Sequence, residues 1–378
     1  MRLLHLSDLH LGKSLYDTSL IEDQAHALAQ AKVVALAAKV DVVAITGDVY
    51  DRAVPPVEAQ ELLDDLLVGL VSRPGVHVIV IPGNHDSPER LSFGSRLMGR
   101  SRVHIARGGR RLEPLTLTDA HGDVTFYPAP YISPGEFREH ADEERKSFTD
   151  IYEALFEPYP RILPGRSVCL AHCFTTGGMA TGDTDERSLT VGGSQLTDPV
   201  VFDRFSLTLL GHLHRPQRVN DRIWYAGSLL PYSFNDGAGA KSFAVYDLAA
   251  DGSITREEIE VQPLRRIGRL RGTYEQVLAG WLGPGPCEDV LEISLLDDQL
   301  PSSYVDQVKA VYRNSMVRWL PPAIAIAADG RSVDELRHRS DEQVVRDFFK
   351  DVGEDLTEDE FAMLDAVLNA LTDAARAE

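Results

Sequence analysis

Five short groups of Asp, Asn and His residues are the most informative chemical feature of this sequence. In chain order they are Asp8-Leu9-His10, Gly47-Asp48-Val49-Tyr50-Asp51, Gly83-Asn84-His85-Asp86, His172 and Gly211-His212-Leu213-His214. They offer carboxylate, amide and imidazole ligands and no thiolate, which suits two divalent ions such as Mn²⁺ or Fe²⁺ better than a closed zinc site. Two such ions about 4 Å apart stabilise both the attacking and the leaving oxygen during hydrolysis of a phosphate ester. The sequence therefore predicts a metal-dependent phosphoesterase.

Each group follows a run of apolar residues that has the length of a buried β-strand. The runs cover residues 3–6, 42–45, 76–81, 168–171 and 207–210. Because their apolar residues are continuous rather than alternating, we expect an α/β fold whose sheet is covered on both faces. Side chains just past the ends of such strands lie along one sheet edge, where open α/β folds place their sites. The glycines at positions 47, 83 and 211 would let the backbone turn sharply and approach the metals closely.

With these motifs the sequence resembles the calcineurin-like metallophosphoesterases. Within that family, the amino-acid sequence at residues 6–13, 44–51, 82–88 and 226–234 is similar to that of the SbcD-type bacterial nuclease branch. The likeness is dense and specific up to about residue 235 and rests mainly on length and layout beyond it. It implies a double β-sandwich flanked by helices.

The resemblance also implies a ligand scheme with two metal ions. One ion would be held by Asp8, His10 and His214, the second by Asn84, His172 and His212, with Asp48 between the two. An ionised carboxylate can bridge in this way because it has two oxygens that can each accept a ligand bond. We expect Mn²⁺, with Fe²⁺ or Mg²⁺ as alternatives.

His85 is the predicted catalytic residue, as a general acid or a transition-state contact. It lies beside a predicted ligand, and imidazole is the side chain best suited to moving protons near neutral pH. The alternative is that His85 only positions Asn84 or Asp86. Asp51 departs from many archaeal and eukaryotic relatives, which have histidine there, so it is expected to cap the following turn or orient a ligand. Asp86 is expected to fix a histidine tautomer.

Composition sets further limits on the class of protein. No apolar stretch of the 378 residues reaches the roughly 18 that a membrane helix needs. The three cysteines are too few and too scattered for a disulfide framework, and Cys169 is interpreted as a small buried hydrophobe. We therefore expect a reducing, cytoplasmic location. The other histidines, at positions 5, 26, 77, 104, 121, 140 and 338, are expected to be structural or on the surface.

The net charge of −20 is unusual for a protein that would hold DNA by itself, because neutralisation of phosphates dominates such binding. Bound cations would offset part of the carboxylate charge of the site. The strongly acidic tail after residue 351 need not face the substrate. We infer that tight DNA binding is shared with a partner.

The chain divides into three predicted parts: a metallophosphoesterase domain at 1–262, a small α+β capping domain at 263–328 and a helical segment at 329–378. In the first part, strands at 222–226, 242–246 and 255–261 are expected to form the second sheet of the sandwich, and 174–196 a substrate-facing loop or a connector. The second part is predicted to be β-α-β-α-β and begins with an arginine cluster at 265, 266, 269 and 271. That cluster could be a basic patch or a solvated strand edge.

The last part is predicted to be a pair of amphipathic helices. Ser332 with Glu335 and Thr357 with Glu360 both fit the capping box that starts a helix. Two lone helices cannot bury their apolar stripes, so they either fold back on the catalytic domain or dock on another protein. The resemblance favours docking on an SbcC-like coiled-coil ATPase. It also implies a homodimer formed through helices of the catalytic core.

By resemblance, the activity would be that of a DNA nuclease. It would degrade double-stranded ends 3′ to 5′ and cut single strands and hairpins in DNA end processing, recombination, replication and repair. One alternative is a small-molecule phosphodiesterase or phosphatase on the same metal site, because fold and ligands alone do not choose the substrate. A second is a non-catalytic scaffold, which the complete set of predicted ligands argues against.

Overall fold

The computed structural model describes residues 1–109, 111–132, 147–179, 196–234, 236, 240–280 and 287–321. Contacts divide these residues into two compact units. The first comprises Met1–Gly268 and Glu288–Leu291. The second contains, of the described residues, 269–280, 287 and 292–321. All predicted ligands belong to the first unit.

A six-stranded sheet with the order β16-β15-β1-β4-β5-β6 forms one half of the first unit. Its strands are β1 (Arg2–Leu6), β4 (Val42–Thr46), β5 (His77–Ile81), β6 (Val103–Ile105), β15 (Ser242–Leu248) and β16 (Ile254–Glu260). The four strands β1, β4, β5 and β6 are parallel, and β15 joins β1 in antiparallel register. Every residue of β4 is buried, as a continuous apolar run predicts for a sheet covered on both faces.

A second six-stranded sheet has the order β13-β14-β12-β9-β8-β7. Its strands are β7 (Leu115–Asp119), β8 (Gly122–Ala129), β9 (Arg166–His172), β12 (Leu207–Gly211), β13 (Gln217–Arg218) and β14 (Ile223–Tyr225). Of these, β8, β9, β12 and β14 run parallel. The prediction that residues 242–246 and 255–261 form this second sheet is wrong, because β15 and β16 extend the first sheet beside β1. Apolar patterning sets which residues are strands, but not which edge a late strand pairs with.

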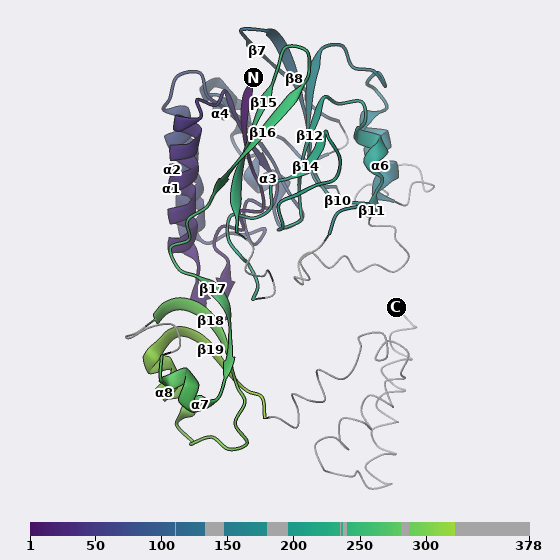
Figure 1. The fold of residues 1–378 in the computed structure, drawn as a ribbon. Coiled ribbons are helices and arrows are strands. Elements are labelled where there is room, and N and C mark those ends of the chain that lie inside the picture. The colour runs from purple at the N-terminus through teal and green to yellow at the C-terminus, as the bar shows by residue number, and fades with distance from the viewer. Residues whose placement is uncertain are drawn as a thin grey trace, which may run out of the picture. The chain divides into compact units, whose positions relative to one another are not determined.

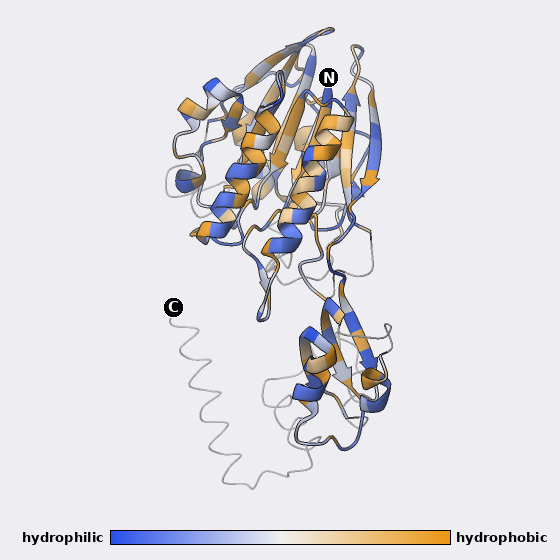
Figure 2. Ribbon diagram, turned by 90° about the vertical axis from the view of Figure 1, so that its left-hand side faces the viewer, coloured by the Kyte–Doolittle hydropathy of each residue, from blue (hydrophilic) through white to orange (hydrophobic). Residues whose placement is uncertain are grey.

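Helices cover the outer faces of both sheets, so the first unit has four layers (Figure 1). The helices α1 (Ile21–Ala37) and α2 (Val57–Val71) pack on the first sheet, and α6 (Phe148–Phe156) with the 3-10 helix η2 (Pro199–Phe202) packs on the second. Figure 2 shows α1 and α2 side by side in front of strands that are mostly hydrophobic. A third apolar core fills the space between the two sheets. This is the predicted double β-sandwich flanked by helices.

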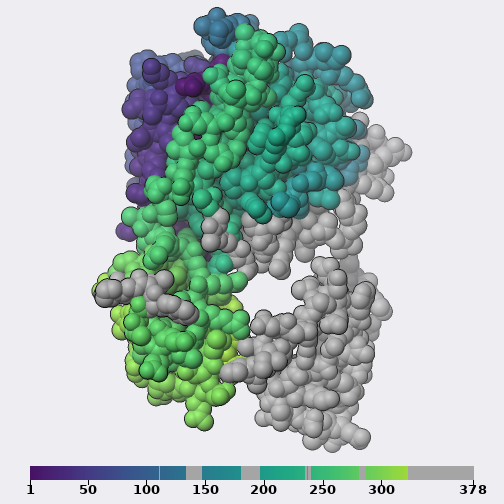
Figure 3. Space-filling model, viewed as in Figure 1, coloured from purple at the N-terminus to yellow at the C-terminus, as the bar shows by residue number. Residues whose placement is uncertain are grey.

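Short elements complete the first unit. They are β2 (Ser14–Leu15), β3 (Thr18–Ser19), α3 (Pro88–Leu91), α4 (Ser95–Met98), η1 (Gly99–Ser101), β10 (Phe174–Thr175) and β11 (Leu196–Thr197). The helices α3 and α4 are separated by a turn at Gly94, whose φ is +75°. In the space-filling view β15 and β16 (green) lie between the purple helical layer and the teal second sheet (Figure 3). Residues 180–195, most of the predicted loop, lie outside the described residues.

Downstream, a three-stranded sheet β17-β18-β19 carries two helices. The elements are β17 (Ile267–Gly272), α7 (Tyr274–Leu278), β18 (Cys287–Leu295), α8 (Tyr304–Val311) and β19 (Tyr312–Trp319), which is the predicted β-α-β-α-β order. The predicted C-terminal helices lie outside the described residues. Within the part of the chain that is described, no helix has the length and apolarity needed to cross a membrane.

Candidate metal centre

Three predicted ligands gather at one place just beyond strands β1 and β12. Asp8 and His10 follow β1, and His214 follows β12. Each offers one ligand atom, and these atoms all lie within 4.8 Å of one another. The His10 Nε2 and His214 Nε2 atoms are 3.2 Å apart. All three residues are buried, so their ligand atoms converge at one place inside the protein.

The other three predicted ligands gather beside them. The side-chain oxygen of Asn84, which follows β5, lies 3.0 Å from His172 Nε2 and 3.1 Å from His212 Nδ1. His172 ends β9 and is fully buried, whereas Asn84 is exposed and His212 half-buried. This second group is therefore open to solvent on the Asn84 side, from which a substrate can approach.

Asp48 lies between the two groups. Its Oδ2 atom is 3.7 Å from His10 Nε2 and 3.3 Å from His172 Nε2. Its Oδ1 atom accepts a 2.9 Å hydrogen bond from the backbone N–H of His85. One carboxylate oxygen thus faces a histidine of each group, which is the placement that a bridging ligand requires.

The hydrogen bonding of His172 tests whether these residues suit a cation. Its Nδ1 lies 2.8 Å from the Thr46 carbonyl oxygen, so Nδ1 must carry the proton and donate it. A neutral ring would then present the lone pair of Nε2 to Asn84 Oδ1 and Asp48 Oδ2, which are both acceptors. A positive charge between these atoms turns that repulsion into coordination. The donor set therefore fits a divalent ion.

The ionisation of the site without cations supports the same interpretation. Burial opposes protonation of His172, but the adjacent Asp48 carboxylate outweighs it and raises the pKa of His172 to about 9. The Asp48 pKa lies well below its ordinary value, since His172 and His10 outweigh the opposing effect of burial. Burial and the neighbouring His172 lower the pKa of His212 to about 3. A proton on His172 thus offsets the negative charge of Asp48, as a bound cation would.

The backbone at the site is held in a conformation that side chains rarely adopt. Asp8, His10, Asp48 and His212 have φ values of +49°, +43°, +48° and +101°. Such residues are costly and persist only where the surroundings fix them, typically at functional sites. Gly47 has φ +91°, and a Cβ there would lie 2.2 Å from His172 Nδ1. The expected close approach at Gly47 is therefore present in the structure.

Asp51 and His85 lie together on the His10 side of the site. Asp51 Oδ1 is 3.0 Å from Lys13 Nζ and 3.6 Å from His10 Nδ1, which is longer than a hydrogen bond. His85 Nδ1 lies 3.0 Å from the Asp51 carbonyl oxygen, and its ring meets that of His10 edge-on at 4.7 Å. Because Nδ1 donates to a carbonyl, Nε2 is the atom of His85 that can exchange a proton with a substrate.

Asp86 has a different role from the predicted one. Its carboxylate accepts backbone hydrogen bonds from Val49 at 3.0 Å, Tyr50 at 2.9 Å and Gly83 at 2.9 Å. The prediction that Asp86 fixes a histidine tautomer is therefore wrong. Burial and the nearby Asp48 raise its pKa to about 6, although the three N–H donors oppose this. Asp86 joins the loop after β4 to the loop after β5.

Several residues that sequence reasoning missed hold the ligand loops in place. Gln24 of α1 donates to the carbonyl of His10 at 2.7 Å, and Tyr152 of α6 donates to the carbonyl of His172 at 3.1 Å. Tyr232 donates to the carbonyl of Leu9, and Lys241 donates to the carbonyl of His214 at 2.8 Å. Of these four, Tyr232 alone lies in a stretch that carries the family resemblance, 226–234.

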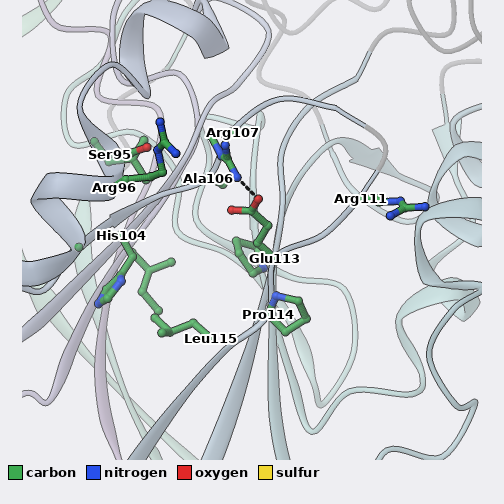
Figure 4. A pocket seen from close by; sticks show the side chains of 13 residues that line it. Ser95, Arg96, His104, Ala106, Arg107, Arg111, Glu113, Pro114 and Leu115 are labelled. Atoms are coloured by element: carbon green, nitrogen blue, oxygen red, sulfur yellow. Dashed lines mark hydrogen bonds and ion pairs between the residues drawn. The ribbon is translucent and has the colours of Figure 1, made fainter.

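The remaining histidines and cysteines behave mostly as expected. His5 is buried and pairs with Thr46 through Nε2 at 2.8 Å, and Cys169 and Cys173 are buried. A separate pocket of about 260 Å³ is lined by Arg96 of α4, His104 of β6 and residues of the loop after β6 (Figure 4). None of the predicted ligands lines it, so it is distinct from the candidate metal centre.

The fold and the ligand constellation together define a class. Residues 1–216 match the family model described as calcineurin-like phosphoesterase, and the chain belongs to that family. It is a metal-dependent hydrolase of phosphate esters, and the family implies a site for two metal ions. The candidate ligands for such a site are the two groups of three side chains described above, together with Asp48.

Two curated relatives extend the likeness to nearly the whole chain. A protein of Staphylococcus saprophyticus, named as the D component of the nuclease SbcCD, is 28% identical over 383 residues, which is 98% of each chain. A protein of Staphylococcus epidermidis with the same name is 27% identical over 357 residues, 93% of each chain. A solved dimetal phosphatase from Danio rerio is 13% identical with a TM-score of 0.38, covering 70% of this chain and 99% of its own. That last likeness is too weak to add to the family match.

Proposed function

We propose that this chain is a two-metal DNA nuclease subunit that works with an SbcC-like ATPase in DNA end processing, recombination and repair. The observation that carries the chemistry is Asp48, whose Oδ2 faces both His10 and His172 within 3.7 Å. The relatives named as nuclease components match 98% and 93% of the chain, well beyond the phosphoesterase core. That extent supports a nuclease rather than a compact small-molecule phosphodiesterase.

In this proposal the predicted ligands keep their two groups. Asp8, His10 and His214 would hold one ion, Asn84, His172 and His212 the other, and Asp48 both. Such ions, with Mn²⁺ as our choice, supply Lewis-acid activation of the phosphodiester and of the attacking water.

The remaining chemistry falls to His85. Its Nδ1–H stays bonded to the Asp51 carbonyl, and Nε2 is free to donate a proton to the leaving oxygen of the cut strand. The exposed Asn84 and the half-buried His85 mark the side from which the DNA would enter.

The charge distribution supports DNA binding that is shared with a partner protein. Arginines of the predicted basic cluster are paired with acids: Arg265 with Asp23, Arg266 with Asp289 and Arg269 with Glu292. Paired arginines offer little net positive charge to phosphates. Together with the net charge of −20, this favours a partner that supplies most of the phosphate contacts.

A homodimer is also part of the proposal. Phe93 and Leu97, in and beside the short helix α4, are 83% and 69% exposed, and Met98 is 38% exposed. Large apolar side chains gathered this closely on a surface mark an interaction site. They are our candidate contact between two copies of the chain.

The test is cleavage of end-labelled duplex and hairpin DNA in Mn²⁺, Mg²⁺ or EDTA by the wild type, His85→Ala and His121→Ala. His121 is exposed and outside the site, so it is the matched control. We expect Mn²⁺-dependent cutting that His85→Ala loses by about 10²- to 10⁴-fold, the usual contribution of a general acid. His121→Ala should cut like the wild type, and both variants should still bind Mn²⁺.

The opposing outcome is equally clear. Hydrolysis of a cyclic nucleotide that far exceeds DNA cleavage, even after an SbcC-like ATPase is added, would favour the small-molecule alternative. Equal activity of wild type and His85→Ala on DNA would remove His85 from the chemistry.

A further inference from the structure

A buried lysine outside the ligand set forms a three-way hydrogen-bond cluster next to the site. The side chains of Lys241 and Asp236 are 7% and 1% exposed, and Lys241 Nζ lies 3.0 Å from Asp236 Oδ2. The same Nζ donates to the His214 carbonyl at 2.8 Å and to Ser228 Oγ at 3.0 Å. An ammonium group has three N–H donors, and each of them has an acceptor here. The geometry therefore fixes where this buried charge can lie.

The cluster holds the backbone of His214 from two directions. Besides Lys241, the backbone N–H of Ser228 donates to the His214 carbonyl at 3.1 Å. Ser228 Oγ in turn donates to the Leu230 carbonyl at 2.7 Å. The imidazole of His214 extends from a backbone that is thus tied to the segment between β14 and β15.

The same cluster reaches His10 through Tyr232. The carboxylate of Asp236 accepts a 3.2 Å hydrogen bond from the backbone N–H of Tyr232. The Tyr232 ring packs edge-on against His10 at 5.2 Å and His214 at 5.8 Å. Its hydroxyl donates to the carbonyl of Leu9, which directly precedes His10. Lys241 and Asp236 therefore lie behind both histidines of the Asp8, His10 and His214 group.

Different residues hold the other group. The His172 carbonyl accepts from Tyr152 of α6 at 3.1 Å, and His172 Nδ1 donates to Thr46. The carbonyl of Cys173 accepts from Tyr225 at 2.8 Å. The hydrogen bonds of Lys241 and Asp236 described above go to the His214 carbonyl, Ser228 and the Tyr232 backbone, on the side of the first group. The two halves of the centre thus have different supports in the main, with one direct link, the 2.9 Å hydrogen bond that the backbone N–H of His212 donates to Asp8 Oδ1.

We propose that Lys241 and Asp236 are positioning residues for one of the two cations only, the one held by Asp8, His10 and His214. Loss of the Lys241 ammonium frees the His214 backbone and the Tyr232 segment, so this half of the centre loses its fixed geometry. The cation at the Asn84, His172 and His212 group keeps its supports. This inference rests on the proposed two-cation centre.

The experiment measures how many Mn²⁺ ions the full-length chain binds and how tightly, by the EPR signal of free Mn²⁺ during a titration. The variants are Lys241→Met, which keeps the length of the side chain without its donors, and Asp236→Asn. The matched control is Arg166→Met. It breaks another buried ion pair, with Asp119, at the opposite end of β9 from His172.

We expect the wild type to bind two Mn²⁺ ions. Lys241→Met should weaken one of them by about 10- to 100-fold, the usual cost of removing a group that orients a ligand, and change the other by less than threefold. Asp236→Asn should weaken the same ion by a smaller factor and serves if Lys241→Met does not fold. Arg166→Met should bind both ions like the wild type although it unfolds at a lower temperature.

Three results would contradict the inference. They are two unchanged ions in a folded Lys241→Met or Asp236→Asn variant, equal weakening of both ions, and the same one-ion loss in Arg166→Met. A wild type that binds fewer than two ions would instead contradict the two-cation centre itself. The failure of the inference and the failure of the proposed function are therefore distinguishable.

Discussion

Gly47 offers a sharp test of how closely the ligand loops must approach one another. Gly47→Ala places a Cβ 2.2 Å from His172 Nδ1 in a backbone with φ +91°. Gly75→Ala is the matched control, since Gly75 has φ +89° and nothing within 4 Å of the added atom. Both variants carry the same backbone strain, but only Gly47→Ala pushes on a predicted ligand.

The size of the effect follows from the distances. A left-handed alanine costs about 1–2 kcal/mol relative to glycine, and this cost is common to both variants. In Gly47→Ala the ring of His172 must move by about 1.2 Å to lengthen a 2.2 Å contact to the ordinary 3.4 Å. That movement breaks the 2.8 Å hydrogen bond to Thr46, which adds about 1–3 kcal/mol for a buried donor left unpaired. A misplacement of about 1 Å at a catalytic centre costs roughly 10²-fold in rate.

The assay combines urea unfolding with Mn²⁺-dependent hydrolysis of bis(p-nitrophenyl) phosphate. We expect Gly75→Ala to lose only stability, and Gly47→Ala to lose more stability together with roughly 10²-fold or more of activity. Activity of Gly47→Ala within threefold of the wild type would refute this reasoning, as would an equal loss of activity in Gly75→Ala.

Three further outcomes are expected. The Arg166 guanidinium holds the pKa of Asp119 well below its ordinary value. The stability that is lost in Asp119→Asn should therefore be fully seen at pH 7 and should shrink as the pH falls below about 4, near the pKa of Asp119 in the unfolded chain. Urea midpoints of the wild type and the variant across pH measure this, and a pH-independent difference would contradict it. Leu97→Asp should shift a dimer to a monomer in analytical ultracentrifugation, whereas Ile162→Asp, at another exposed apolar position, should not. Deletion of residues 332–378 should abolish co-purification with an SbcC-like ATPase and leave hydrolysis of the small diester. Loss of the hydrolysis together with the association would rule out this division of roles.

The strands that precede the ligands were predictable because burial on both faces leaves a plain signal. The run 42–45 forms most of β4, and 207–210 forms most of β12. The ligand residues follow strands as expected, but the prediction of a single sheet edge is wrong, because β1, β4 and β5 belong to the first sheet and β9 and β12 to the second. The grouping of Asp8, His10 and His214 came from the family resemblance, and the structure brings these three side chains together.

Other features leave no local trace in the sequence. The pairing of β15 with β1 joins residues such as Leu4 and Val245 that are far apart along the chain, and no period of apolar residues encodes such a choice. The role of Asp86 was mistaken because its neighbours in sequence are ligands, whereas its hydrogen-bond partners are backbone groups. Lys241 precedes a strand and is indistinguishable from an ordinary surface lysine until the fold buries it.

The origin of the ligands in two separate sheets has a mechanical consequence. Asp8 and His10 extend from the first sheet and His214 from the second, while Asn84 comes from the first and His172 from the second. Each cation would therefore cross-link the two sheets, much as a disulfide joins two segments of a chain. The sheets otherwise meet largely through apolar side chains, joined by a few polar contacts such as that of Arg166 with the Leu248 carbonyl. Metal loading would thus add a bond between the two halves of the domain, and a change in the apolar layer between them would alter metal affinity from a distance.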